Sequence, residues 1–192
     1  NIGAHAAMPV MEGKAVLFKS FGGVNAVPIC LDTQDTEEII KTVVNIAPAF
    51  GGINLEDISA PRCFEIESRL KELLDIPVFH DDQHGTAIVV LAGIINGLKV
   101  TGKTKEECKV VINGACSAGV AITKLLLTYG FKNVTMCDKS GILSKNSEGL
   151  NWMQKSMMDV TNLEGKTGSL ADALVGADVF VGVSAPNIVT AD

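Results

Sequence analysis

Two short acidic stretches hold the residues of this sequence that are best suited to chemistry. The stretch GGINLEDISAP places Glu56 and Asp57 side by side, and the stretch FHDDQHGTA places Asp81 and Asp82 side by side between two histidines. Each pair directly follows a short apolar run that predicts a β-strand. Because the carboxyl ends of neighbouring parallel strands meet at one edge of a sheet, where open α/β sheets bind ligands, we expect both pairs at the same edge.

The side chains of these two stretches favour a hard cation. Three or four carboxylates that converge without cysteine suit Mg²⁺ or Mn²⁺ better than zinc. His80 and His84 are four residues apart and raise a zinc alternative, but His80 is expected on the strand, so the two rings would not share a helix face. A structural role is favoured for both histidines. Asp82 alone also fits a helix N-cap, which would leave the other carboxylates unexplained.

A lysine near the start of the chain is a candidate general base. Lys14 lies in PVMEGKAVLF, between a glycine and a predicted strand. Most lysines are solvated surface residues, and spacing alone does not favour Lys14 over Lys19. A lysine beside a bound cation would have its pKa lowered by the like charge and by desolvation, and would then be able to accept a proton.

The segment KVVINGACSAGVAITKLL is typical of a strand, a tight turn and a helix. Its glycines match the first and third glycines of a G-x-G-x-x-G dinucleotide fingerprint, at Gly114 and Gly119, with Cys116 at the middle position. In this fingerprint the amides at the helix N-terminus hold a pyrophosphate. Asp138 ends the next predicted strand, where it would bind ribose hydroxyls. Lys139 would meet a 2′-phosphate, so NAD and NADP both stay open.

A second glycine-bearing strand end, VGVS, is expected beside the same crevice. Its Ser184 would either contact the cofactor or cap a turn. The plainer interpretation of the whole segment is an ordinary βα turn with a buried cysteine. Asp138 at the expected distance favours cofactor binding instead.

Short apolar runs alternate with helical patterns, which predicts an α/β fold. We expect a parallel-sheet metal- and substrate-binding region over residues 1–102, followed by a Rossmann-type NAD(P)-binding domain over residues 103–192. The polar segment TGKTKEE marks the boundary. The first region is expected to lack its N-terminal part, and the second its C-terminal part. The expected strands are 15–19, 26–31, 52–55, 76–79, 109–113, 133–137 and 179–183, and the expected helices are 37–46, 61–74, 84–99, 117–129 and 169–176.

Three helices carry further expectations. Thr36 is a plausible N-cap for the helix over 37–46, and Pro61 stands at the first position of the helix over 61–74. The helix over 84–99 is apolar nearly all round and is therefore expected to be buried.

Composition limits the class of protein. A hydrophobic content of 47% and a mean hydropathy of +0.30 indicate a compact soluble protein. The apolar run over 87–98 is too short to span a bilayer. Residues 1–100 hold 13 Asp and Glu against 7 Lys and Arg, and this acidity disfavours nucleic-acid binding. Five cysteines without CxxC spacing indicate reduced thiols in a cytoplasmic compartment.

Five motifs together resemble the bacterial-type malic enzymes over nearly the whole chain. They are PVMEGKAVLFK, PICLDT, IAPAFGGINLEDISAPRCFEIE, IPVFHDDQHGTAIVVLAG and the turn NGACSAG. The resemblance implies oxidative decarboxylation of L-malate to pyruvate and CO₂, with NAD or NADP and with Mg²⁺ or Mn²⁺. It also implies a cytoplasmic homodimer or larger homo-oligomer that acts on small molecules, without nucleic-acid or membrane partners.

The resemblance implies a role for each site residue. Glu56, Asp57 and Asp82 would bind the metal, and Asp81 would support them as a close neighbour without binding it. Lys14 would be the general base. The residues that would line the pyrophosphate are Ala115, Cys116, Ser117 and Ala118. The family usually has glycine where Cys116 stands.

Two other interpretations stay open. A Rossmann-type amino-acid dehydrogenase would lack the set of Glu56, Asp57 and Asp82. A non-catalytic nucleotide-binding module is suggested by Cys116 and by the family's catalytic tyrosine, which belongs to an N-terminal segment outside this sequence. Tyr129, at the end of the helix after the dinucleotide turn, cannot replace that tyrosine.

Overall fold

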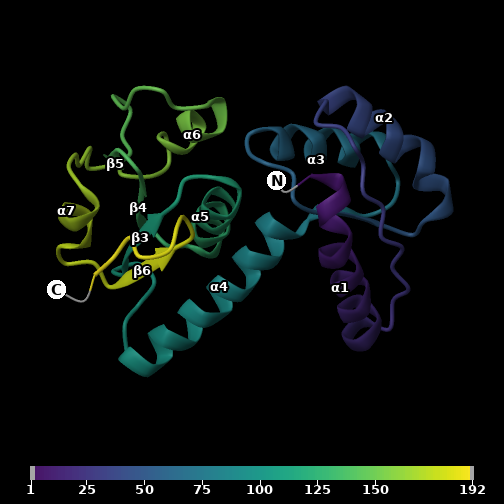
Figure 1. Ribbon diagram of the computed structural model, residues 1–192. Coiled ribbons are helices and arrows are strands. Elements are labelled where there is room, and N and C mark those ends of the chain that lie inside the picture. The colour runs from purple at the N-terminus through teal and green to yellow at the C-terminus, as the bar shows by residue number, and fades with distance from the viewer. Residues whose placement is uncertain (1–2, 191–192) are drawn as a thin grey trace. The chain divides into compact units, whose positions relative to one another are not determined.

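The computed structural model describes residues 3–190, which fall into two compact units (Figure 1). Among the described residues, one unit comprises 3–53 and 65–78, and the other comprises 54–64 and 79–190. Both acidic pairs and the glycine-rich turn belong to the second unit, whereas Lys14 belongs to the first. The compact units therefore divide the chain at other positions than residue 102, and a functional boundary there stays a prediction.

The second unit is built on a four-stranded sheet with the strand order β5-β4-β3-β6. β3 (Lys109–Asn113) pairs in parallel with β4 (Asn133–Asp138) and with β6 (Val179–Gly182). These three strands confirm the expected ones and the parallel α/β class. β5 (Gly141–Ile142) runs antiparallel to β4 and, at two residues, left no signal in the sequence.

Alternate side chains of β3 pack into two different hydrophobic clusters. Val110 and Ile112 share a core with α4 (Asp81–Thr101) and α5 (Ser117–Tyr129). Val111 faces the other way and packs with residues of α7 (Leu170–Leu174). Because successive side chains of a strand point to opposite faces, five consecutive residues hold the sheet between helices on both sides.

A short helix absent from the sequence-based prediction covers part of this unit. α6 (Trp152–Met157) begins with a capping box, in which the amide of Gln154 donates to Asn151 Oδ1 at 2.9 Å and the amide of Asn151 donates to Gln154 Oε1 at 3.0 Å. The ring of Trp152 meets the ring of Phe64 edge to face, with centroids 6.1 Å apart. Six residues are too few for a helical period to show in the sequence.

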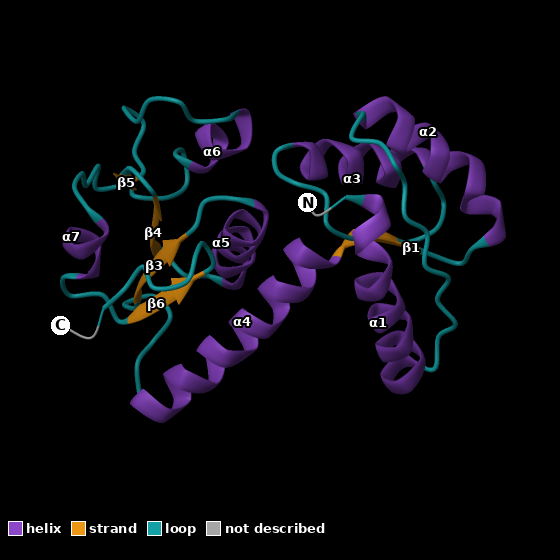
Figure 2. Cartoon of the chain, in the orientation of Figure 1, coloured by secondary structure: helices purple, strands orange, loops and turns teal. Residues whose placement is uncertain are grey.

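The first unit is mainly helical (Figure 2). It contains α1 (Ala4–Gly22), α2 (Thr36–Ile46), the 3₁₀ turn η1 (Ala47–Ala49) and most of α3 (Arg62–Leu73). The apolar runs over 52–55 and 76–79 predicted two strands, and these are present as β1 (Ile53–Leu55) and β2 (Val78–His80). Most residues of both strands belong to the second unit, where the two strands pair with each other and not with the four-stranded sheet.

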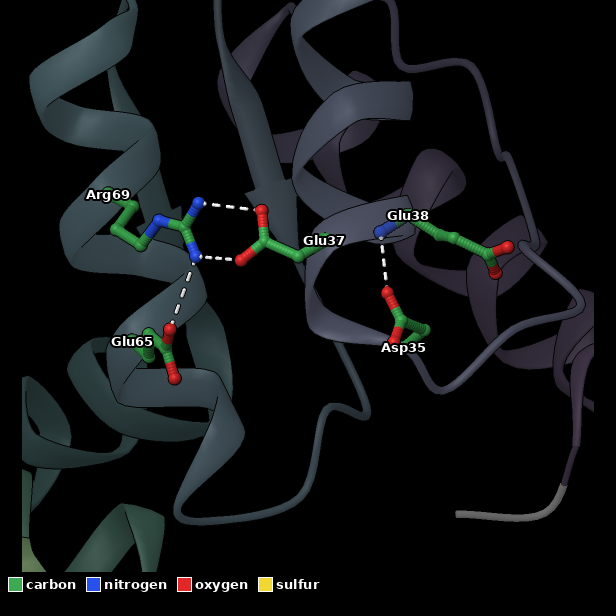
Figure 3. Close-up of polar contacts among 5 residues, drawn as sticks. All are labelled: Asp35, Glu37, Glu38, Glu65 and Arg69. Atoms are coloured by element: carbon green, nitrogen blue, oxygen red, sulfur yellow. Dashed lines mark hydrogen bonds and ion pairs between the residues drawn. The ribbon is translucent and has the colours of Figure 1, made fainter.

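Arg69 joins α3 to α2 (Figure 3). Its guanidinium binds both carboxylate oxygens of Glu37, with Nη2 2.8 Å from Oε2, and also donates to Glu65 at 3.2 Å. The N-cap of α2 is Asp35, which accepts a hydrogen bond from the amide of Glu38 at 2.9 Å. The expected N-cap, Thr36, is wrong and is instead the first helical residue.

Two expected strands of the first unit are wrong. Residues 15–19 lie inside α1, because a short apolar run cannot be distinguished from a helix segment by periodicity alone. Residues 26–31 form no regular element, and Pro28 in their middle has no N–H to donate to a strand ladder. The other expected helices are present with shifted ends, and only the helix over 117–129 has the predicted bounds.

The expectation that the helix over 84–99 is buried is wrong on one side of α4. Ala87 and Ile94 are buried in the core, whereas Ile88, Val89 and Val100 are exposed to 62%, 67% and 88%. The second unit supplies α5 and the sheet as packing partners for one side only. By length and composition α4 is also apolar enough to cross a bilayer. A single helix of this kind is weak evidence of a membrane span, because a helix that packs into a protein core passes the same test.

Candidate functional site

A hydrogen bond joins the two acidic stretches. The backbone amide of Asp57 donates to Oδ2 of Asp82 at 3.1 Å, across 25 residues of chain. Asp57 follows β1 and has a φ of 57°, and Asp82 lies in the first turn of α4, directly after β2. The structure thus brings the stretches together as expected. The N-cap of α4 is His80, so Asp82 is not the cap.

The donors around this contact fit a divalent cation in kind. Glu56, Asp57 and Asp82 supply carboxylate oxygens, which hard cations prefer. Asn54 and Gln83 lie close to these carboxylates in the sequence. Oδ1 of Asn54 and Nε2 of Gln83 are buried without a hydrogen-bond partner among the described residues. Buried polar atoms are normally satisfied, so a ligand or water is expected there. Within residues 3–190 no three His, Cys, Asp or Glu side chains already form a metal cage, so the ligand set stays a prediction.

The two histidines of FHDDQHGTA lie on different elements. His80 ends β2 and is fully buried, with Nε2 4.0 Å from Oδ2 of Asp82. His84 lies on α4. As the sequence predicted, the two rings do not share a helix face. His80 is buried at the end of β2, next to Asp82.

Close backbone approach explains both glycines of the dinucleotide turn. Gly114 has a φ of 122°, and a Cβ there would lie 2.7 Å from the carbonyl oxygen of Val183. A Cβ on Gly119 would lie 2.9 Å from the carbonyl carbon of Gly114 and closer still to its oxygen. Cys116 is the N-cap residue of α5 and is exposed, so it is not buried as the plainer interpretation expected. The described backbone therefore matches the fingerprint at both ends.

The carboxyl ends of β4 and β6, the strands on either side of β3, carry the other two predicted cofactor residues. Asp138 is the last residue of β4, and its Oδ1 accepts a hydrogen bond from the amide of Ser140 at 2.7 Å. Oγ of Ser184 is 3.1 Å from Nδ2 of Asn113, the last residue of β3. Asn113 was not among the predicted site residues, although a polar residue at the end of an apolar strand was a usable signal.

One hydrophobic cluster supports both the acidic stretch and the dinucleotide turn. Cys63 and Phe64 share this cluster with Ala115 of the turn, and Ile58, one residue after Asp57, packs against it. Nε2 of Gln154 donates to the carbonyl oxygen of Ala115 at 2.9 Å, so α6 also holds the turn. The second unit by itself therefore carries the carboxylates and the dinucleotide turn on a common core.

Lys14 lies within α1 and is partly buried. Lys14 was expected at the start of a strand, but it lies on a helix. Its role as general base stays a prediction.

Two family models match the chain. The malic enzyme N-terminal domain matches residues 1–71, and the malic enzyme NAD-binding domain matches residues 83–189. The chain belongs to the malic enzyme family. The resemblance seen in the motifs is thereby confirmed, together with an NAD(P)-type cofactor domain.

Several malic enzymes are similar to the chain in sequence and structure. It is 61% identical to an NAD-dependent malic enzyme of Geobacillus stearothermophilus over 98% of the chain and 39% of that protein. It is 56% identical to a bifunctional malic/malolactic enzyme of Bacillus subtilis over 99% of the chain and 47% of that protein. The crystal structure of an NAD-dependent malic enzyme from Thermotoga maritima superposes with a TM-score of 0.96 at 53% identity, over 99% of the chain and 51% of that structure. The chain thus spans about two-fifths to one-half of the length of these relatives.

Proposed function

We propose that the protein containing this chain converts L-malate to pyruvate and CO₂ with reduction of NAD⁺ or NADP⁺. The observation that carries the proposal is the common core beneath the Glu56–Asp57 stretch and the dinucleotide turn. A carboxylate site built beside a dinucleotide turn suits hydride transfer from a metal-bound hydroxy acid. Membership of the malic enzyme family supports the same reaction.

The residues of the chain divide the chemistry among them. Glu56, Asp57 and Asp82 would hold Mg²⁺ or Mn²⁺, and a bound ion would act as a Lewis acid toward the substrate oxygens. Lys14, carried over by motif, would accept the C2 hydroxyl proton at Nζ while hydride leaves C2 for the nicotinamide. Cleavage of the C3–C4 bond then releases CO₂. The remaining enol needs a proton at C3, which no residue of this chain is proposed to supply.

The dinucleotide would lie across the glycine-rich turn. The amides after Gly114 would hold its pyrophosphate at the N-terminus of α5. Ala115, Cys116, Ser117 and Ala118 would line it. The carboxylate of Asp138 would bind ribose hydroxyls and would repel a 2′-phosphate, which favours NAD⁺ over NADP⁺.

The reaction is tested with the full-length protein. Pyruvate and reduced dinucleotide are measured from malate and Mn²⁺ with each coenzyme, before and after addition of a chelator. We expect stoichiometric products, faster turnover with NAD⁺, and loss of turnover with the chelator. Dinucleotide binding without pyruvate formation would contradict the proposal and would favour a non-catalytic module. Metal-independent turnover would favour another dehydrogenase class.

The cellular compartment and the oligomeric state of the whole protein are also proposals. We expect a cytoplasmic homodimer or larger homo-oligomer that acts on small molecules. Light scattering of the full-length protein measures the oligomer, and a monomeric mass would contradict this part.

A further inference from the structure

Asp81 and Asp82 begin α4 side by side, but their carboxylates occupy different places. The Asp82 carboxylate accepts a hydrogen bond from the backbone amide of Asp57. Asp81 instead lies against Gly85, one helical turn further along: a Cβ on Gly85 would be 2.9 Å from Cγ of Asp81 and nearer still to its Oδ1. The Asp81 carboxylate thus occupies the space that a side chain at position 85 would need.

Helix propensity does not explain a glycine at this position. Glycine is less favourable than alanine inside a helix, so a functionless glycine here would weaken α4. The other two glycines of α4, Gly93 and Gly97, differ from Gly85, because nothing lies within 4 Å of a Cβ built on either of them. Within α4 only Gly85 is in steric contact with an acidic side chain of the candidate site.

We propose that Gly85 is a positioning residue of the malic enzyme site. Its missing side chain leaves the space in which the Asp81 carboxylate lies along the first turn of α4, while the Asp82 carboxylate turns to Asp57. An aspartate carboxylate is separated from the backbone by one carbon, so a methyl group at position 85 forces it into another staggered rotamer. The steric part of this inference stands alone, and its consequence for turnover rests on the proposed function.

The test compares Gly85→Ala with Gly97→Ala in the full-length protein. We expect Gly85→Ala to lower kcat roughly 10- to 100-fold, the range typical when the support of a metal site is disturbed. The KM for the dinucleotide is expected to stay within about twofold, because the turn at Gly114 is untouched. Gly97→Ala is expected to keep the wild-type kcat. Wild-type kcat in Gly85→Ala would overturn the inference.

Asp81→Ala variants separate positioning from a general structural role. With Asp81 replaced, Gly85→Ala should raise the melting temperature as much as Gly97→Ala does, because the methyl group then meets open space. With Asp81 present, the rise should be smaller or reversed. Equal rises in both backgrounds would overturn the inference. If the wild-type protein forms no pyruvate from malate, the proposed function fails, and this melting-temperature comparison alone decides the role of Gly85.

Discussion

Asp82 and Asp138 carry the same functional group and are suited to different tasks by their surroundings. Asp82 accepts a hydrogen bond from the amide of Asp57 in a distant stretch of chain, which joins its carboxylate to the Glu56–Asp57 stretch. Asp138 accepts the amide of Ser140, two residues on, at the end of a strand. The first arrangement suits a cation, and the second suits hydroxyl groups of a ribose.

Replacing Asp82 by asparagine tests the metal role. Asparagine keeps an oxygen for the amide of Asp57 but removes the charge, so we expect the fold to persist and Mn²⁺ affinity to fall by roughly 100-fold. Isothermal titration calorimetry with Mn²⁺ measures the affinity. Asp75→Asn, which changes an exposed aspartate just before β2, is the control. Unchanged Mn²⁺ affinity in Asp82→Asn would remove this residue from the ligand set.

Exposure makes the cysteines differ in reactivity. Cys116 is exposed at the start of α5, whereas burial, together with Asp138, raises the pKa of the Cys137 thiol to about 11. We expect iodoacetamide to modify Cys116 well before Cys137, and saturating dinucleotide to slow the modification of Cys116. Mass spectrometry of digests over time measures both rates. Protection by the dinucleotide at Cys30 as well would show that the effect is not specific to the turn.

At the scale of elements, the dinucleotide turn depends on how closely α5 approaches β3. Gly119→Ala would place a methyl group against the carbonyl of Gly114, which is backbone and cannot rotate away. We expect a loss of about 1–3 kcal/mol in the free energy of unfolding and weaker dinucleotide binding. Urea unfolding followed by the fluorescence of Trp152, the single tryptophan, measures the first quantity. Gly93→Ala is the control, and a similar result for both variants would contradict the packing argument.

The contact between α2 and α3 should depend on pH. The hydrogen bond from Arg69, offset in part by desolvation, holds the pKa of Glu37 below its usual value. A lowered folded-state pKa adds stability above the unfolded pKa, about 4.3, and this stability is lost as pH falls through the folded-state value. The wild type should therefore melt at a higher temperature than Glu37→Gln near pH 7. This difference should disappear in acid. A melting-temperature difference that keeps its full size in acid would contradict this assignment.

At the scale of the whole molecule, α4 has two unlike sides although its sequence is apolar nearly all round. Ile94 belongs to the core of the second unit, and Val89 is exposed. We expect Ile94→Ala to cost about 2–5 kcal/mol in the 192-residue chain and Val89→Ala to change its stability by no more than about 0.5 kcal/mol. Urea unfolding of both variants measures the difference. Equal losses would show that Val89 is also packed in solution.

The sequence by itself determined the features whose signals are local. The glycine-rich turn, the strands β3, β4 and β6, and the acidic stretches each show within a few residues, because turn chemistry and strand periodicity act at short range. Even there, a local signal was ambiguous for the run over 15–19, which is helical. Short elements such as α6 were too brief to show a period.

Only the tertiary structure decided which local features meet. The hydrogen bond from Asp57 to Asp82 and the cluster that joins Ile58 to Ala115 link residues far apart in the chain, and their partners are set by packing. The exposed side of α4 likewise follows from what the fold supplies around the helix. Composition records only that the helix is apolar, because burial is a property of neighbours in space and not of neighbours in sequence.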